Sequence, residues 1–232
     1  MNKTLCIIPA RGGSKRIPRK NVLPLNGIPL IAYTIRSAKH SGVFDKIVVS
    51  TEDDEIAQVA ISEGVEVDAR PMEMAGDKVT KVQVVKEYLE RTNAENEFDN
   101  IAALLPTCPF RTAEDVQSAA NVFFENKENE FLIGVVEYEF PIQLALKKRD
   151  GKVVEMENTD GYLTTRSQNI EKKYHPNGAI YLASIKAFKR RGTFFNEKML
   201  YYEMPQLRSF DIDYPYQFQI AEIIAKQISE QE

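Results

Sequence analysis

Short apolar runs alternate with amphipathic segments along most of this chain, and this alternation limits the folds that the chain can adopt. The first run, at residues 5–8, is continuously apolar, as expected of a strand buried on both faces. Two glycines follow it, and then a helical pattern begins near Pro29 and ends near Gly42. Strand-like and helical runs continue in turn at residues 46–50, 53–64, 66–70, 79–90, 101–105, 112–124 and 131–137. The alternation predicts an α/β fold with a mainly parallel sheet covered by helices on both faces.

The pattern changes between about residues 140 and 177. Residues 144–156 indicate a hairpin that turns at Asp150 and Gly151, and a polar stretch dotted with aromatic residues follows. The alternation then resumes and ends in the segment SFDID and a helix, whose apolar face carries Phe218, Ala221, Ile224, Ala225 and Ile228. We therefore predict a single domain, residues 1–232, with an inserted lobe at about residues 138–177.

Composition excludes several classes of function. The chain has 232 residues, 43% of them hydrophobic, and a formal net charge of -4, which argues against a general nucleic-acid binder. No apolar stretch is long enough for a signal peptide or a membrane span, so we expect a cytoplasmic protein without a membrane partner. Cys6 and Cys108 have no C-x-x-C spacing, and we expect both to be free thiols.

Residues 11–20, RGGSKRIPRK, collect five cations around two glycines in an acidic chain. In a doubly wound sheet, the loop after the first strand is the usual place for a phosphate. Gly12 and Gly13 would let backbone N–H groups approach oxygen atoms, while Arg11 and Lys15 would supply charge. The spacing fits neither a P-loop nor a dinucleotide fingerprint. The alternative interpretation is a solvated basic loop.

A second candidate group is the D-I-D segment near the C-terminus. Alternation along a strand would place the carboxylates of Asp211 and Asp213 on one face, where they could share a divalent cation. Mg²⁺ suits such a pair because it accepts one or two carboxylates and completes its shell with phosphate and water. The alternative is an exposed strand end that caps the following helix. Together with the basic loop, the pair favours a metal-assisted nucleotide site.

Five segments in order carry a resemblance to a known family: IIPARGGSKRIPRKN, VVSTEDDEIAQVA, LPTCPFRTAEDV, HPNGAIYLA and DIDYPYQFQIAE. They resemble the cytidylyltransferases that make CMP-activated nonulosonic acids, the group that contains the CMP-sialic acid synthetases. The resemblance implies a Rossmann-like three-layer α/β/α sandwich with a small inserted dimerisation lobe, and a homodimer. It also implies a reaction in which the anomeric hydroxyl of a nine-carbon 2-keto sugar acid attacks the α-phosphorus of CTP, assisted by Mg²⁺ or Mn²⁺.

The resemblance assigns roles residue by residue. It places Arg11, Gly12, Gly13, Ser14 and Lys15 in the triphosphate loop, with Lys15, Arg11 and Asp211 as the catalytic residues. It places Asp211 and Asp213 at the metal, and adds to the nucleotide site Lys20, Asn21 and Arg70. Its implied sugar-binding residues are Gln143, Arg166, His175, Asn177 and Tyr181. Arg16 and Arg19 stay without a settled role, since a surface position and phosphate contact explain them equally well.

Departures from the family pattern bear on the sugar. Leu105 stands where many sialic acid synthetases have Gln, and the segments EFPIQ, TRSQ and Tyr174-His175 resemble the pseudaminic acid branch. The turn PTCPFRTAED is more like the sialic and legionaminic branches, so those acids remain alternatives to pseudaminic acid. Arg166 could pair with the sugar carboxylate across the dimer or be a surface arginine, and His175 could bind the sugar or be structural.

Two other functions compete with this hypothesis. One keeps the nucleotidyl transfer and changes the acceptor, for example to an octulosonate, although the spacing of the basic loop argues against it. The other is a non-catalytic protein that binds a nucleotide or polyanion through the same loop. Such a binder would tolerate loss of the two aspartates, whereas an enzyme would not.

Overall fold

The computed structural model describes residues 2–126, 128–151, 153–157 and 164–230. A seven-stranded sheet forms its centre, with the strand order β11-β7-β10-β6-β1-β4-β5. All pairings are parallel except those of β10, which runs antiparallel to both of its neighbours. The strands are β1 (Thr4–Pro9), β4 (Lys46–Thr51), β5 (Glu66–Ala69), β6 (Asn100–Ala103), β7 (Phe131–Glu137), β10 (Tyr174–Ser184) and β11 (Leu200–Glu203).

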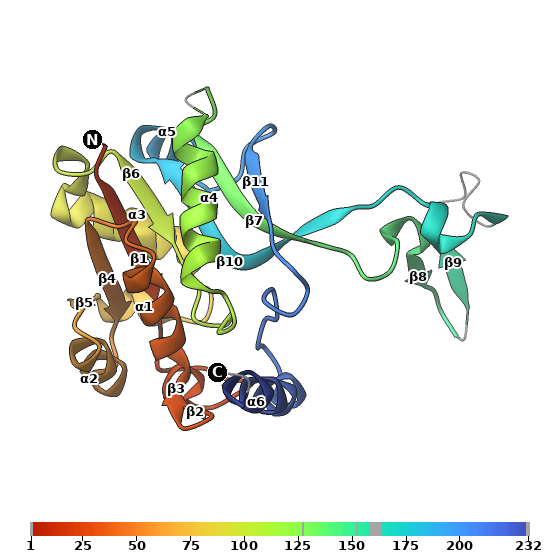
Figure 1. The fold of residues 1–232 in the computed structure, drawn as a ribbon, viewed down its shortest axis with the longest axis horizontal. Helices are drawn as coiled ribbons and strands as arrows, with labels where there is room; N and C mark the ends of the chain where they lie inside the picture. The colour runs from red at the N-terminus through yellow and green to blue at the C-terminus, as the bar shows by residue number, and fades with distance from the viewer. Residues whose placement is uncertain (1, 127, 152, 158–163, 231–232) are drawn as a thin grey trace.

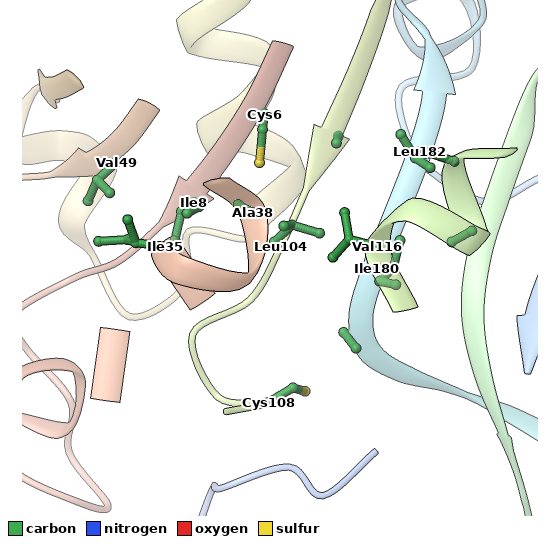
Figure 2. Close-up of a cluster of buried hydrophobic side chains, with 14 of the residues drawn as sticks. Cys6, Ile8, Ile35, Ala38, Val49, Leu104, Cys108, Val116, Ile180 and Leu182 are labelled. Carbon is green, nitrogen blue, oxygen red and sulfur yellow. The ribbon is translucent and has the colours of Figure 1, made fainter. Parts of the chain in front are cut away.

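Helices cover both faces of this sheet, which confirms the predicted three-layer α/β/α fold (Figure 1). One face packs against α1 (Leu30–His40), α2 (Asp54–Ser62) and α4 (Ala113–Glu125), and the other against α3 (Lys81–Thr92) and α5 (Ile185–Arg191). Cys6 and Ile8 point into the first core, and Leu5 and Ile7 into the second. Figure 2 shows side chains of the first core converging from several strands and helices. The unbroken apolar run at residues 5–8 therefore reflects burial on both faces.

Helix starts follow local capping chemistry. Thr112 and Asp115 form a reciprocal capping box at the start of α4, and the Asp53 carboxylate accepts hydrogen bonds from the N–H groups of Glu55 and Ile56 at the start of α2. These bonds satisfy N–H groups that have no partner within the helix. The sequence predicted both helices from their place in the alternation, and the caps lie next to the apolar faces that they introduce.

An arm projects from the main body between β7 and β10 (Figure 1). It carries the antiparallel strands β8 (Leu146–Lys148) and β9 (Val154–Met156), which confirms the predicted hairpin, and Gly151 has a positive φ of 73° in its turn. Two short 3-10 helices, η4 (Ile142–Leu144) and η6 (Ser167–Asn169), flank the hairpin strands. β10 already begins at Tyr174, within the stretch predicted to form the insertion, and pairs there with β7.

The last strand expected from the sequence does not form, so the placement of Asp211 and Asp213 on a strand is wrong. Residues 209–213 are irregular, and the Ile212 N–H donates to the carbonyl of Thr107, a loop residue, at 2.9 Å. The segment leads from the edge strand β11 to α6 (Pro215–Ser229) without pairing with a strand. Ile212 is nevertheless fully buried, whereas Asp211 and Asp213 on either side of it are partly exposed. The polar-apolar alternation of the sequence therefore still separates a buried side chain from two partly exposed carboxylates.

A third, smaller core holds the C-terminal helix against the rest of the molecule. Phe218 and Ala221 of α6 pack there with Ile17, from the basic loop, and with Ile212. The same cluster therefore anchors two segments that are almost 200 residues apart. The remaining short elements are η1 (Lys20–Val22), β2 (Pro24–Leu25), β3 (Ile28–Pro29), η2 (Met72–Ala75) and η3 (Ala94–Asn96). Among the described residues, no helix is both long and apolar enough to cross a membrane.

Candidate active site

The basic loop joins β1 to η1, and its two predicted catalytic cations meet on one carboxylate. Arg11 Nη1 lies 2.8 Å from Asp77 Oδ1, and the Lys15 ammonium pairs with the other oxygen of Asp77. These hydrogen bonds, with that from Lys15 the larger cause, hold the pKa of Asp77 below its ordinary value. Arg11 and Lys15 therefore converge on one carboxylate, so both cations can reach a single anionic group.

A side chain at Gly12 would have to displace Asp53. A Cβ built on Gly12 would lie 2.3 Å from Asp53 Oδ2, whereas a Cβ on Gly13 would meet nothing within 4 Å. The Gly12 N–H donates to Glu52 Oε1 at 2.8 Å, and Ser14 N–H donates to the Gly12 carbonyl at 3.0 Å. Gly12 therefore packs closely against Asp53, and its N–H group is hydrogen-bonded to Glu52, the residue that follows β4.

Arg70 lies beside this loop and is almost completely buried. Its Nε donates to Glu52 Oε2 at 3.0 Å and its Nη1 to the Met74 carbonyl at 3.4 Å, whereas Nη2 has no partner among the described residues. Burial is the main influence on Arg70 and lowers its pKa, although Glu52 opposes the shift. Asn21 donates from Nδ2 to the Arg11 carbonyl at 2.9 Å. Arg70 and Asn21 therefore border the loop, and one buried nitrogen of Arg70 has no hydrogen-bond acceptor among the described residues.

Sequence reasoning missed Glu52, which joins these parts. One of its oxygens accepts from Gly12 and the other from Arg70, so a single carboxylate sets the spacing between the loop and the buried arginine. A signal was present in the sequence, because Glu52 directly follows a buried strand at the edge where ligands bind. Nothing local distinguished it from its neighbours Asp53 and Asp54.

Lys20 brings the distant D-I-D segment to the basic loop. Its ammonium donates to the Ile212 carbonyl at 2.7 Å and to Asp213 Oδ1 at 3.1 Å. Arg16 donates to the other oxygen of Asp213 at 3.0 Å, and its guanidinium carbon lies 4.7 Å from the ring centroid of Tyr214. The basic loop and the D-I-D segment therefore meet in one place.

The structure separates the two arginines that the sequence left unassigned. Arg16 reaches Asp213, whereas Arg19 pairs with Asp53 and Glu55 at the start of α2. Arg19 also adopts a left-handed backbone conformation with φ of 58°, which turns the chain into η1. Arg16 thus belongs to the candidate site, while Arg19 fastens the loop to a neighbouring helix.

The aspartate pair fits a magnesium site completed by phosphate. Burial raises the pKa of Asp211, and the nearby negative charge of Asp213 raises it further, while Lys20 and Arg16 oppose the shift. A divalent cation would relieve the repulsion between the two carboxylates. The described residues contain no group of three or more Asp, Glu, His or Cys side chains able to hold a metal. Two carboxylates with phosphate and water as the remaining ligands suit Mg²⁺.

Two of the predicted sugar-binding residues lie near this centre in the folded chain. Tyr181 is buried, and burial, followed by the charges of Cys108 and Asp211, raises its pKa to about 12. Asn177 is also buried, but its amide is already used: Nδ2 donates to Ser209 Oγ at 3.0 Å, and Oδ1 accepts from the Ala179 N–H at 3.0 Å. Asn177 therefore holds the β10 backbone against the segment before the D-I-D residues.

The other three predicted sugar residues lie on or near the arm. Gln143 is buried there and donates to the Glu171 carbonyl at 2.9 Å, while its Oε1 has no partner among the described residues. Arg166 is exposed and directly precedes η6. His175 packs its ring against Tyr138, with centroids 4.6 Å apart. Because the arm projects from the main body, Gln143 and Arg166 are not brought to the basic loop within one chain (Figure 1).

An open cavity of about 440 Å³ lies at the base of the arm, where β7 and β11 end. Tyr138, which lines it, packs against His175, and Met204, also in its wall, contacts Asn177. Glu137, Glu203 and Gln206 give the cavity polar walls. Two predicted sugar residues therefore lie directly behind its lining.

Lys81 and Cys108 are further groups near Asp211 that the sequence did not single out for this site. The Lys81 ammonium lies 4.1 Å from the ring centroid of Tyr181, and burial lowers its pKa against the opposing charge of Asp211. Cys108 Sγ lies 3.2 Å from the Asn177 carbonyl and 3.9 Å from Asp211 Oδ1. Burial raises the pKa of the Cys108 thiol to about 12, so it remains protonated at neutral pH.

Comparison with known proteins gives consistent matches over nearly the whole chain. Residues 5–231 match the family described as cytidylyltransferase. The pseudaminic acid cytidylyltransferase of Campylobacter jejuni is 35% identical over 226 residues, which cover 97% of each chain. The N-acylneuraminate cytidylyltransferase of Escherichia coli is 32% identical over 219 residues, 94% of this chain and 51% of that protein.

Solved structures agree on the fold. A CMP:2-keto-3-deoxy-manno-octonic acid synthetase complexed with CTP superposes with a TM-score of 0.71 at 16% identity, covering 97% of this chain and 99% of the other. The 4-diphosphocytidyl-2C-methyl-D-erythritol synthase of Anaerococcus prevotii gives a TM-score of 0.67 at 13% identity, covering 97% and 99%. At these identities the likeness concerns the arrangement of the sheet and helices.

Proposed function

The chain belongs to the cytidylyltransferase family, and from this premise we propose that it activates a nine-carbon 2-keto sugar acid with CTP, giving a CMP-sugar and pyrophosphate. The observation that carries the proposal is the contact of Lys20 with both the Ile212 carbonyl and Asp213. This contact places two carboxylates beside a basic loop at the end of β1, as a metal-assisted nucleotide site needs.

The reaction breaks a phosphoanhydride bond of CTP and forms a phosphate ester bond to the sugar. The oxygen of the sugar's anomeric hydroxyl bonds to the α-phosphorus of CTP, the bond from that phosphorus to the bridging oxygen breaks, and pyrophosphate leaves; the hydroxyl proton is released. Arg11 and Lys15 bind the β- and γ-phosphates and stabilise the charge that accumulates on the departing pyrophosphate. Arg70 and Asn21 hold the nucleoside, and the buried Nη2 of Arg70, which has no acceptor among the described residues, would gain one there.

Asp211 and Asp213 would hold Mg²⁺, or alternatively Mn²⁺. When bound, the cation screens the phosphate oxygens and acts as a Lewis acid toward the phosphoryl group. Lys20 and Arg16 orient Asp213 through its two oxygens, so that the carboxylate is fixed before the nucleotide arrives. Such prior fixation reduces the reorganisation needed in the reaction.

We favour pseudaminic acid as the sugar, because the relative with that name in C. jejuni matches 97% of the chain. N-acetylneuraminic and legionaminic acids are the alternatives, supported by the 32% identity to an N-acylneuraminate cytidylyltransferase. Tyr181 and the cavity at the base of the arm, with His175 and Asn177 behind its lining, mark the side on which the sugar would lie. We propose that the protein acts in the cytoplasm, where CTP is made.

We also propose a homodimer in which the arm of one subunit reaches the site of the other. Gln143 and Arg166 lie on this arm, and apolar side chains such as Phe140 and Leu146 are exposed on it. A partner subunit would cover these side chains and could bring Arg166 to the carboxylate of the sugar. The function of the arm thus depends on assembly.

The direct test incubates the protein with CTP, Mg²⁺ and, separately, pseudaminic, legionaminic and N-acetylneuraminic acid, and measures pyrophosphate release. We expect the highest kcat/KM for pseudaminic acid. Activity on N-acetylneuraminic acid alone would overturn the choice of sugar, and activity on an octulosonate alone would overturn the nonulosonate class.

An Asp211→Asn variant separates the enzyme from a non-catalytic nucleotide binder. Removing one carboxylate from the pair should abolish turnover while CTP binding through Arg11 and Lys15 largely persists. Isothermal titration with CTP reports the binding, and pyrophosphate release reports the turnover. Undiminished release by Asp211→Asn would contradict the metal role of the pair.

A further inference from the structure

Lys81 is a half-buried cation without an acidic partner in contact. It is the first residue of α3, and its ammonium lies 4.1 Å from the ring centroid of Tyr181 and 5.9 Å from that of Phe195. The Lys81 ammonium makes neither a hydrogen bond nor a salt bridge among the described residues. The other two lysines of the site differ, because Lys15 pairs with Asp77 and Lys20 pairs with Asp213.

The aromatic rings only partly satisfy this ammonium. A ring face attracts a cation electrostatically, but the three N–H groups of a lysine normally seek oxygen acceptors. Burying an ammonium without such acceptors is unfavourable, and burial is the main influence that lowers the Lys81 pKa. A ligand that brings anionic oxygen atoms would supply the missing acceptors.

The surroundings of Lys81 indicate which part of a nucleotide this ligand would be. Asp77, four residues earlier in the chain, contacts both Arg11 and Lys15. Asp211 is the charged group that acts on Lys81 and raises its pKa against the larger effect of burial. Lys81 therefore begins the helix that follows the carboxylate bound by the cations assigned to the β- and γ-phosphates, and its ammonium feels the charge of a carboxylate assigned to the metal. The reacting phosphorus must lie between those cations and the metal.

We propose that Lys81 binds the α-phosphoryl group of the nucleotide, an inference that rests on the proposed function. Its ammonium donates hydrogen bonds to the non-bridging oxygens of that group in the substrate, in the transition state and in the CMP-sugar product. It remains protonated and takes no proton in the reaction. Because Tyr181 and Phe195 shield it from water, its charge acts on the phosphoryl oxygens more strongly than an exposed lysine would.

The test compares the binding of cytidine, CMP and CTP to wild type and to Lys81→Met by isothermal titration in Mg²⁺. Methionine keeps an unbranched apolar stem against Tyr181 and removes the charge. CMP has only the α-phosphate, so its affinity should fall about 10- to 100-fold, as expected for loss of a charge-assisted hydrogen bond. The affinity for CTP should also fall, whereas that for cytidine should change less than about twofold, and Lys81→Arg should restore part of the CMP affinity.

Lys86→Met is the matched control, because Lys86 is an exposed lysine five residues further along the same helix. It should bind all three ligands as wild type does. Thermal melts of each variant establish that it is folded, and Lys81→Gln serves as a second variant if Lys81→Met does not fold.

Three results would overturn the inference. Unchanged CMP affinity would show that Lys81 does not contact the α-phosphate. An equal loss of affinity for cytidine and for CMP would mean that Lys81 acts on the nucleoside or on the fold. A rise in KM for the sugar acid with unchanged CMP affinity would assign Lys81 to the sugar carboxylate. Failure of the proposed function looks different, because the wild type itself would then neither bind CTP nor release pyrophosphate.

Discussion

Glu52 shows how one side chain organises the nucleotide side of the site. Its carboxylate is 10% exposed and the Arg70 side chain 4% exposed, so the ion pair between them is largely shielded from water. The same carboxylate accepts the Gly12 N–H. A buried pair of this kind contributes little net stability, but loss of one partner is costly because the other charge is left uncompensated. Glu52 therefore links the stability of the fold to the shape of the phosphate loop.

Replacing Glu52 by Gln should lower the free energy of unfolding by about 3 kcal/mol, since it leaves the buried Arg70 guanidinium without its carboxylate. Urea denaturation of the purified variant measures this change. Glu66→Gln is the control, because Glu66 is 65% exposed in its pair with Lys46 and its loss should cost no more than about 1 kcal/mol. Equal effects of the two substitutions would contradict the role given to burial.

Lys15→Ala tests the phosphate loop directly. Loss of one preorganised donor to the triphosphate should raise the barrier by on the order of 2 to 4 kcal/mol, with the effect in kcat/KM measured by pyrophosphate release. Lys15 is 78% exposed, so the substitution should leave the melting temperature almost unchanged. Lys186→Ala, at an exposed lysine of α5, should have wild-type kinetics. A decrease of less than about threefold for Lys15→Ala would argue against a phosphate contact.

Among the helices, α1 and α2 are joined by a paired ionic contact at their C-terminal ends. Arg36 of α1 donates to Glu63, which ends α2, through Nε at 3.0 and 3.1 Å and through Nη2 at 2.6 Å. The contact with Arg36 is the main cause that lowers the pKa of Glu63. These helices cover the side of the sheet next to the basic loop, so the pair helps to hold that side in place.

The Glu63 pair predicts a pH dependence of stability. Because the folded pKa is below the unfolded value of about 4.3, the stabilisation is present above that pH and disappears as the pH falls through the folded pKa. Glu63→Gln should therefore melt below wild type at pH 7, and the difference should shrink as the pH falls below the unfolded pKa of about 4.3 and through the folded one. Glu73→Gln, at an exposed glutamate, should show no such convergence. A Glu63→Gln difference independent of pH would contradict the ionic origin of the effect.

At the scale of the whole molecule, the arm exposes large apolar side chains to solvent when the chain is alone. Phe140 is 82% exposed, and Leu146, Val153 and Val154 are each more than half exposed on the same arm. Apolar surface gathered in this way is characteristic of an interface. It agrees with the proposal that two subunits exchange their arms over each other's sites.

Replacing both Phe140 and Leu146 by Glu should convert the proposed dimer to a monomer, because charges at the interface would have to be desolvated. Light scattering after size-exclusion chromatography measures the mass. The rate of pyrophosphate release should fall when the dimer is lost, since Arg166 would no longer reach the sugar bound to a partner subunit. Ile61→Glu, at an exposed isoleucine of α2, should remain dimeric and active. A monomeric wild type, or an active monomeric variant, would contradict the arm's proposed role.

Local chemistry made most of the fold predictable from the sequence. The apolar run at residues 5–8 follows from burial of the strand on both faces. The capping box at Thr112 depends on a side chain close to the N–H groups that it accepts from, and the hairpin turn depends on a positive φ at Gly151. The strand expected at residues 209–213 failed for a non-local reason. Its alternation was real, but the segment bonds to the loop at Thr107 instead of to a strand.

The sequence by itself determined the alternating α/β architecture, the hairpin on the inserted segment and the chemical character of the basic loop and the D-I-D residues, because each depends on near neighbours in the chain. Only the tertiary structure decided how they combine: Lys20 and Arg16 turn to Asp213, Arg19 turns away to Asp53, and Lys81 comes to lie beside Tyr181. The physical reason is that a charged side chain takes the partner that the fold places within its reach. That partner depends on where distant segments cross the end of the sheet.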